Sequence, residues 1–482
     1  MSSDVPKETL LRDFGRALVE RNGAFFIGAG MSRAAGFVDW RGLLKDIASD
    51  LGLDIDRETD LLSIAQFHEN HAGNRGKINQ ALLDEFTRGA SPTLNHSLIA
   101  TLPINLIWTT NYDTLIEDQL RAVGRRPDVK HSESQLANRV SASDVTVLKM
   151  HGDITMPGDA VLTRDDYEGF GRKRQLFSEK LQGDLISQTF LFLGFSFTDP
   201  NIDYILSRVR VLLGKNVRNH FCVMRRPSLA APHDPVASAD FEYESRRLDL
   251  RIQDLKRYGI QTVLVDDFSE VTELLSDLNK ASHSQEVFVS GSAHDYAPMG
   301  RDRLEGLCRL LGKELIGSRF NIVNGFGLGV GGLVSLSAIE SVYTTPGERL
   351  DDRVLFRPFP QEPPQGMSLK DLWTKYRTDM ISQAGHAVFI AGNKLDSASG
   401  AAINAAGVRE EFEIAKSMGK TLIPIGASGW VAKELWEEVS RDASELFPNL
   451  NVRSELAALG SDASSEQEIV SAVLALLQKV RR

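Results

Sequence analysis

The chain has 482 residues, of which 42% are hydrophobic and 25% are charged, the balance of a soluble globular protein. Because a single core stops growing beyond about 250–300 residues, this length predicts at least two domains. The net charge is −10 at pH 7 and no basic block compensates it, which excludes a general nucleic-acid binder.

The beginning of the chain is polar and lacks the apolar core of a signal peptide. No apolar stretch approaches the roughly 20 residues of a membrane helix, so we expect a cytoplasmic protein that does not enter a membrane. The chain has 2 cysteines, Cys222 and Cys308, too few for a four-cysteine zinc site. Neither a bound metal nor a cofactor is expected.

Residues 7–22 have the apolar spacing of an amphipathic helix, and the apolar run at 25–27 predicts a buried strand. This strand ends in a loop of small residues, Gly28, Ala29, Gly30 and Ser32. Backbone amides in such a loop can approach a phosphate, and the N-terminus of the following helix favours the anion. Small residues after a strand can equally make a plain tight turn, so this loop alone leaves nucleotide binding open.

The segment between this strand and the next has the pattern of helices, which we predict at residues 40–51, 60–86 and 94–102. Three β-leaning runs follow, at residues 105–108, 145–148 and 190–193. The residues that suit a binding site come just after these runs: Asn111, Asp113, His151, Gly194 and Ser196. Because ligands bind beyond the carboxyl ends of parallel strands, these loops are expected to converge on one crevice.

The remainder of the first half continues this alternation of helices and strands. The polar stretch at residues 122–144 is interpreted as a connection, and the proline-containing segment 225–240 as a surface loop. Helices are predicted at 177–188, 201–213, 241–258 and 271–278, and strands at 219–224 and 259–265. We therefore expect an α/β domain with a helical insertion between its first two strands.

These motifs, in this order, resemble those of the sirtuin-like NAD-consuming family over roughly residues 8–280. The resemblance implies catalysis by Asn111 and His151. It also implies an NAD-binding set made of Gly28, Ala29, Gly30, Ser32, Asn111, Asp113, Gly194 and Ser196. Two departures stand out: Thr110 replaces the family's glutamine, and residues 38–41 replace its proline–aspartate–phenylalanine–arginine run. Protein-deacetylating sirtuins carry a zinc module that two cysteines cannot build, which disfavours peptide deacetylation.

The chemistry of these residue types fits cleavage of the N-glycosidic bond of NAD. The Asn111 amide offers a donor and an acceptor that suit a ribose hydroxyl or a water molecule, and His151 can accept a proton near neutral pH. Structural alternatives are a hydrogen-bonded histidine at a turn and a helix cap for Asn111. Asp113 is expected to orient its loop or cap a helix. Trp40 either covers the nicotinamide side of the site or belongs to the core.

The second half repeats the pattern of strands that end in small residues. Strands are predicted at 287–289, 320–323, 387–390 and 421–425, and one or two terminal helices at 456–480. The fold class predicted for the whole chain is therefore α/β with two Rossmann-like parallel-sheet domains.

The second half resembles the SLOG family of Rossmann-like domains, through its Ser-Gly-Ser turn, its glycine-rich second loop and the charged helix after Gly392. The hydrolases of that group have a tight Pro-Gly-Gly-x-Gly-Thr turn where this chain has residues 391–394 and a loose loop, which favours a binding domain. A nucleotide messenger would be bound by phosphate-facing amides, by cations and by one carboxylate. The predicted residues are Ser290, Gly291, Ser292, Gly325, Gly327, Arg377, Lys394 and Glu411. The alternative for Arg377 and Glu411 is that both are solvated helix charges.

A sirtuin-like domain at residues 1–283 fused to a SLOG-like domain at 284–482 resembles the NAD-hydrolysing effectors of Thoeris antiphage defence systems. The resemblance implies an NAD⁺ glycohydrolase that releases nicotinamide and ADP-ribose when a cyclic ADP-ribose-type messenger binds the second domain. It also implies NAD depletion and a homotetramer or larger assembly. Two alternatives stay open: an NAD-dependent deacylase or ADP-ribosyltransferase, and a non-enzymatic nucleotide-sensing scaffold.

Overall fold

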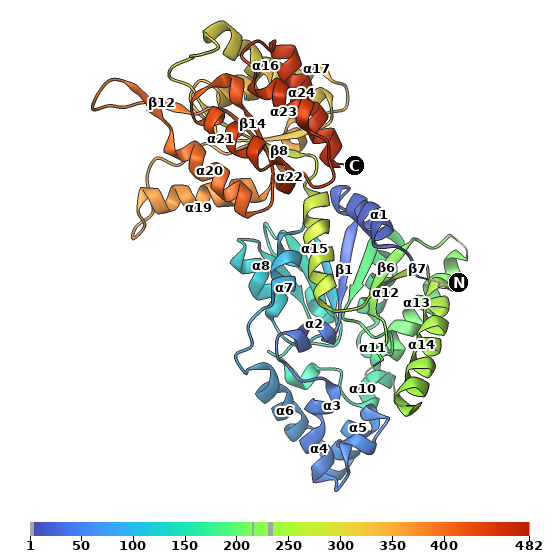
Figure 1. Cartoon of the computed structure of the whole chain (residues 1–482). Coiled ribbons are helices and arrows are strands. Elements are labelled where there is room, and N and C mark those ends of the chain that lie inside the picture. The colour runs from blue at the N-terminus through green and yellow to red at the C-terminus, as the bar shows by residue number, and fades with distance from the viewer. Residues whose placement is uncertain (1–3, 215, 230–234, 482) are drawn as a thin grey trace. The chain divides into compact units, whose positions relative to one another are not determined.

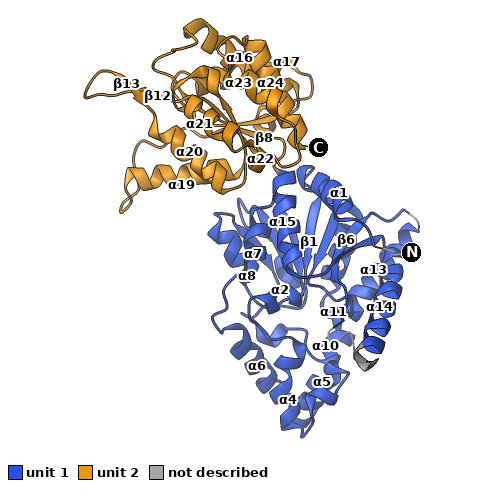
Figure 2. Cartoon of the chain, viewed as in Figure 1, with its two compact units in different colours: residues 1–282 blue, residues 283–482 orange. Residues whose placement is uncertain are grey.

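The computed structural model describes residues 4–214, 216–229 and 235–481. The chain divides into two compact units, Met1–Ser282 and His283–Arg482 (Figure 2). Each unit is built around its own parallel sheet, so the predicted class of two Rossmann-like parallel-sheet domains is confirmed. Among these residues, no helix combines the length and apolar character needed to cross a bilayer.

The sheet of unit 1 contains seven strands in the order β3-β4-β2-β1-β5-β6-β7, and every pairing is parallel. Three of these strands, β1, β6 and β7, are labelled in Figure 1. The strands are β1 Gly23–Ile27, β2 Leu106–Thr109, β3 Pro127–Lys130, β4 Val145–Lys149, β5 Thr189–Leu193, β6 His220–Arg225 and β7 Ile260–Val265. The chain order reverses between β1 and β5. Open α/β sheets bind ligands at such a reversal.

The central strands are apolar throughout because helices cover both faces of the sheet. Alternate residues of β1 enter different cores: Phe25 packs with apolar residues of α1, α7 and α15, and Phe26 with those of α12, α13 and α14. These helices are α1 Lys7–Val19, α7 Leu94–Thr101, α15 Ser269–Ser282, α12 Gln175–Ser187, α13 Pro200–Leu213 and α14 Pro235–Lys256. The shorter helices are α8 Leu115–Ala122, α9 Glu133–Leu136, α10 Arg164–Glu168 and α11 Phe170–Lys173.

The helical insertion between β1 and β2 is confirmed. It contains α2 Ala29–Ala34, α3 Trp40–Leu43, α4 Lys45–Asp50, α5 Leu61–Ala72 and α6 Gly76–Phe86 ahead of α7. The helices predicted at 40–51 and 60–86 are each broken in two, at Leu44 and around Gly73. Gly73 has a φ of 67° and ends α5 in the left-handed conformation.

Two predicted connections of unit 1 differ from the structure. The stretch 122–144 contains the edge strand β3, whose charged residues Asp128 and Lys130 are buried and lie 2.7 Å apart as an ion pair. A strand with paired buried charges looks polar in the sequence. In the segment 225–240, β6 extends to Arg225 and α14 begins at Pro235, whereas residues 230–234 lie outside the described part of the chain.

Unit 2 has five parallel strands in the order β10-β9-β8-β11-β14, with a reversal between β8 and β11. They are β8 Glu286–Ser292, β9 Asn321–Asn324, β10 Val354–Phe356, β11 His386–Ala391 and β14 Thr421–Ile425. Its helices are α16 Arg301–Gly317, α17 Gly331–Thr344, α18 Leu350–Arg353, α19 Leu369–Ser382, α20 Ala406–Ser417, α21 Trp430–Arg441, α22 Ala443–Leu446, α23 Arg453–Gly460 and α24 Glu466–Arg481. The segment expected to be a loose loop after Ala391 forms the hairpin β12 Asn393–Leu395 and β13 Ala402–Asn404.

Candidate functional site

A cavity of about 580 Å³ lies at the carboxyl ends of β1, β2, β4 and β5 in unit 1, a volume typical of small-molecule sites. His151 lines it, as do most residues of the predicted NAD-binding set: Ala29, Gly30, Ser32, Asn111, Gly194 and Ser196. Gly28 and Asp113 do not line the cavity. The four strand-end loops therefore converge at the point where the strand order reverses.

The glycines of the first loop serve a contact between two backbones. A Cβ on Gly28 would lie 2.5 Å from the carbonyl oxygen of Gly194, and one on Gly30 would lie 2.8 Å from the Cα of Gly194. The amide of Gly30 donates to the Gly194 carbonyl at 2.9 Å, and that of Gly28 to Leu193 at 2.9 Å. These two amides are used inside the protein, so the glycines serve the packing of the two loops and their amides are not free donors for a phosphate.

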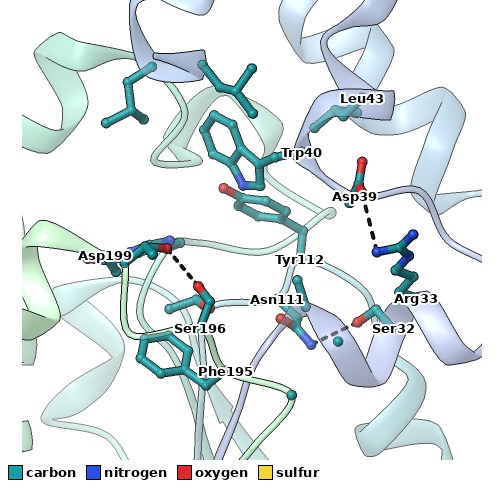
Figure 3. Close-up of a pocket in the computed structure, with 18 of the residues that line it drawn as sticks. Ser32, Arg33, Asp39, Trp40, Leu43, Asn111, Tyr112, Phe195, Ser196 and Asp199 are labelled. Carbon is teal, nitrogen blue, oxygen red and sulfur yellow. Dashed lines mark hydrogen bonds and ion pairs between the residues drawn. The ribbon is translucent and has the colours of Figure 1, made fainter. Parts of the chain in front are cut away.

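The Asn111 side chain lies between these loops and the cavity (Figure 3). Its amide nitrogen donates to the Gly28 carbonyl at 3.1 Å and to Ser32 Oγ at 2.8 Å. Because a carbonyl only accepts, the Gly28 contact fixes which side of the amide carries the nitrogen. The oxygen Oδ1 is buried and has no partner among the described residues, so it is the atom left to accept a hydrogen bond.

Asp113 holds this arrangement from behind the cavity wall. It accepts a 2.5 Å hydrogen bond from Ser32 Oγ, and its second oxygen accepts from the backbone amide of Leu115 at 3.0 Å. Ser32 therefore links the Asn111 amide to the Asp113 carboxylate. Asp113 orients its loop and the start of α8.

His151 follows β4 and lies within 3.1 Å of the Asp199 carboxylate, measured from Nε2 to Oδ2. The two groups are within ion-pair distance, although their angle is not that of a well-directed hydrogen bond. The imidazole is buried and packs edge-on against Tyr167 and Phe170, at ring-centre distances of 5.4 and 6.0 Å. Burial acts to raise the pKa of the Asp199 carboxyl, but His151 and two backbone amides outweigh it and hold the pKa below its usual value.

Lys149 lies beneath the loop that carries Asn111 and is fully buried. Its ammonium group donates to the carbonyl oxygens of Tyr112 at 3.1 Å and Asp113 at 2.5 Å. It also pairs with Glu117 at 3.0 Å and with Asp153. Burial raises the pKa of Glu117. A fully paired lysine of this kind fixes the loop rather than reacting with a ligand.

The cavity wall includes Trp40, for which the sequence left two roles open, and also Tyr112 and Asp199, for which the sequence predicted no role in binding. Figure 3 shows Trp40 and Tyr112 above Asn111, and both line the cavity together with Asp199. Trp40 is half-buried, and it both lines the cavity and packs against the hydrophobic core of the insertion. Asp199 also caps α13, because its Oδ1 accepts from the backbone amides of Asn201 and Ile202. Its place just beyond the end of β5 was the signal for a role in the site.

Unit 2 has a corresponding cavity of about 620 Å³ at the carboxyl ends of β8, β9 and β11. All eight residues predicted for messenger binding line it: Ser290, Gly291, Ser292, Gly325, Gly327, Arg377, Lys394 and Glu411. The cavity also contains Phe359 and Trp373, which the sequence analysis did not identify. The spacing of Trp373 and Arg377, four residues apart on α19, places both on one helix face.

Three charged residues of this second cavity, Arg377, Glu410 and Glu411, form a cluster of ion pairs. Arg377 lies 2.9 Å from Glu410 and 3.2 Å from Glu411, and its guanidinium lies 5.1 Å from the centre of the Phe359 ring. Glu411 accepts a further hydrogen bond from Ser290 Oγ at 2.5 Å, while burial raises its pKa. Arg377 and Glu411 are therefore not solvated helix charges, because both are largely buried.

Known protein families match both halves of the chain. Residues 105–249 match the SIR2-like domain family, and residues 270–480 match the Sir2- and TIR-associating SLOG family. The class defined by fold and site is therefore a SIR2-like domain joined to a SLOG domain.

Relatives that cover nearly the whole chain share this organisation of domains. The NAD(+) hydrolase ThsA of Bacillus cereus is 42% identical over 98% of both chains, and that of Cytobacillus dafuensis is 42% identical over 98% of this chain and 97% of its own. The NAD(+) hydrolase ThsA of Acinetobacter baumannii is 40% identical over 90% of both chains. The chain belongs to the ThsA family of NAD(+) hydrolases. This membership confirms the expected resemblance and the class of enzyme.

Proposed function

We propose that unit 1 cleaves NAD⁺ to nicotinamide and ADP-ribose in the 580 Å³ cavity, with Asn111 and His151 as the catalytic residues. The observation that carries this proposal is that both side chains line one cavity at the switch point of a parallel sheet. NAD binds along the loops that follow β1, β2 and β5. No metal and no further cofactor takes part.

Cleavage of the N-glycosidic bond develops positive charge on the ribose carbon, as in other glycoside hydrolyses. The unpartnered Oδ1 of Asn111 accepts from a ribose hydroxyl or from the attacking water. His151 takes the proton that this water loses as it bonds to carbon. Trp40 and Tyr112 contribute apolar surface that keeps other water from the reacting bond.

We further propose that a cyclic ADP-ribose-type messenger binds in the cavity of unit 2 and switches the hydrolase on, which depletes NAD during antiphage defence. Arg377 and Lys394 complement its phosphates, Glu411 accepts from a ribose hydroxyl, and Phe359 and Trp373 offer faces for stacking. A shift from mostly inactive to mostly active needs about 10⁴-fold preference for the active state, or about 5.5 kcal/mol. A homotetramer or larger assembly, in the cytoplasm, spreads that requirement over several sites.

The test is to incubate the purified full-length chain with NAD, with and without each cyclic ADP-ribose isomer, and to follow the products by chromatography. The proposal expects nicotinamide and ADP-ribose in equal amounts, formed faster with one isomer and without any acylated protein. Turnover that requires an acyl-lysine peptide or an acceptor protein would replace hydrolysis with deacylation or ADP-ribosyl transfer. Tight NAD binding with no product under every condition would leave a nucleotide-sensing scaffold.

A further inference from the structure

The contact between His151 and Asp199 joins two loops that are 48 positions apart in the chain. Asp199 lies at the N-terminus of the 14-residue helix α13. Its Oδ1 accepts from the amides of Asn201 at 2.9 Å and Ile202 at 3.1 Å, which fixes the plane of the carboxylate. The other oxygen, Oδ2, is thereby held toward Nε2 of His151, 3.1 Å away.

The short distance between Oδ2 and Nε2 favours one protonation state of the imidazole. A carboxylate only accepts, so it favours the tautomer with hydrogen on Nε2 and leaves the lone pair on Nδ1. Nε2 is also buried and makes no well-directed hydrogen bond with any of the residues described, so the Asp199 carboxylate is its only charged neighbour within ion-pair distance among them. The negative charge of Asp199 would also stabilise the imidazolium that forms when Nδ1 accepts a proton.

We propose that Asp199 is a positioning residue for the reaction of unit 1, which holds His151 in the tautomer that can act as a base and stabilises its protonated form. The inference rests on the proposed function, because it gives His151 a catalytic task. In the step concerned, the water O–H bond breaks as its oxygen bonds to the ribose carbon. The proton moves to Nδ1, and the electron pair of the N-glycosidic bond leaves with nicotinamide. Asp199 remains a carboxylate throughout.

Other ionisable groups near His151 do not replace this role. Burial raises the pKa of both Tyr112 and Tyr167, so each stays neutral across the pH range of an assay. In the segment that carries His151, at the end of β4, Lys149 and Asp153 are paired with each other. The cavity has three further charged residues, Arg33, Asp39 and Asp60. All three are exposed to solvent, and a substitution at Asp199 leaves their charges as they are.

The decisive variant is Asp199→Asn in the full-length chain, because asparagine still caps α13 but lacks the charge. Its amide would present a donor to Nε2 and favour the wrong tautomer. We expect kcat to fall by at least ~10²-fold, with KM for NAD within about threefold of the original. Removing a negative charge lowers the pKa of a nearby histidine, so the acid limb of the kcat–pH profile should move to lower pH.

Asp199→Ser provides a second capping residue without charge, and should shift the acid limb in the same direction. The double variant His151→Ala/Asp199→Asn should be no slower than His151→Ala alone, because Asp199 acts through the imidazole. All variants are assayed with NAD alone and with the cyclic ADP-ribose isomers, after thermal unfolding shows that they are folded.

The results for these variants distinguish the role of Asp199 from the catalytic role of His151. If His151→Ala keeps normal turnover, the catalytic role of His151 fails and the role of Asp199 fails with it. If His151→Ala is inactive but Asp199→Asn and Asp199→Ser keep kcat and an unmoved acid limb, the hydrolase mechanism stands and Asp199 is a helix cap only.

Discussion

The ammonium group of Lys149 donates to the carbonyl oxygen of Asp113 at 2.5 Å, and so ties the end of β4 to the loop after β2. Replacing Lys149 with methionine leaves Glu117 and Asp153 buried without their cation. Breaking a buried pair in this way costs about 3–5 kcal/mol. Urea unfolding of Lys149→Met at pH 7.5 should show that loss. Lys280→Met, which removes an exposed ion pair with Asp277, should cost less than about 1 kcal/mol; equal losses in both variants would contradict this explanation.

Substitution of either proposed catalytic side chain should abolish most NAD turnover. His151→Ala removes the base, which typically costs 10²- to 10⁴-fold in kcat. Asn111→Ala removes the amide that bridges Gly28 and Ser32 as well as the free Oδ1. The exposed residues His71 and Asn138 provide matched controls, because their alanine variants remove the same groups outside the cavity. Nicotinamide release, followed by chromatography, measures the effect. Unchanged release by both catalytic variants would refute the assignment.

The backbone contact at Gly194 predicts strict intolerance of a side chain. Gly194 has a φ of 62°, and a Cβ there would lie 2.7 Å from the amide nitrogen of Met31. Gly194→Ala should therefore destabilise the protein by at least ~1 kcal/mol and lower turnover, because the two loops of the cavity are forced apart. Gly183→Ala meets nothing within 4 Å inside α12 and should raise stability slightly. Differential scanning calorimetry compares the two, and a neutral Gly194→Ala would disprove the packing role.

In unit 2, Arg377 should determine the affinity for the messenger. Arg377→Met removes charge-assisted hydrogen bonds worth about 1.5–3 kcal/mol each, so the messenger concentration for half-maximal activation should rise at least ~10-fold. Arg377→Lys should rescue it only partly, since lysine lacks the planar fork. Arg301→Met, at an exposed position on α16, serves as the control. Titration of NAD cleavage with the activating isomer tests this prediction, which fails if all three variants respond alike.

Acid should destabilise unit 1 through His220. Its Nδ1 accepts a 3.2 Å hydrogen bond from the amide of Phe190, and burial lowers its pKa to about 3. The folded state therefore keeps this histidine neutral, and the resulting stability is complete above the unfolded pKa of about 6.5. It is lost as the pH falls from there toward 3, because the unfolded chain binds the proton first.

At pH 5 this loss amounts to about 2 kcal/mol. His220→Asn keeps an acceptor near the position of Nδ1 but cannot titrate. The difference in unfolding free energy between pH 7.5 and pH 5 should thus be about 2 kcal/mol smaller in the variant, as measured in urea. An unchanged difference would mean that other groups govern the acid response.

The parts of the fold that could be predicted are those marked by a pattern of neighbouring residues in the sequence. Continuous apolar runs such as 190–193 identified the central strands, since both faces of a parallel sheet are covered. The edge strand β3 was missed because Asp128 and Lys130 neutralise each other only after folding. The hairpin after Ala391 was missed because its strands are three residues long and joined by small polar residues.

The candidate site likewise contains residues that a local sequence pattern indicates and residues that it does not. Residues at strand ends, such as Asn111 and His151, were expected to share one crevice because of their position along the chain, and both line the cavity. Asp199, which lies beside His151, and Lys149, which holds the loop after β2, make contacts with distant segments, and no local pattern encodes such contacts. The same reason explains why the glycine loop was interpreted in terms of phosphate, whereas its closest neighbour is Gly194.

The close approach of Gly28 and Gly30 to Gly194 also limits which walls of the cavity can move. Two backbone segments in direct contact have no side chains that can change rotamer to accommodate a movement. We therefore expect this wall of the cavity to be rigid. A change in the shape of the cavity would then have to come from the other wall, to which the insertion contributes Trp40, Leu43 and the segment 59–62. A regulator that changes this shape would therefore act by displacing those helices.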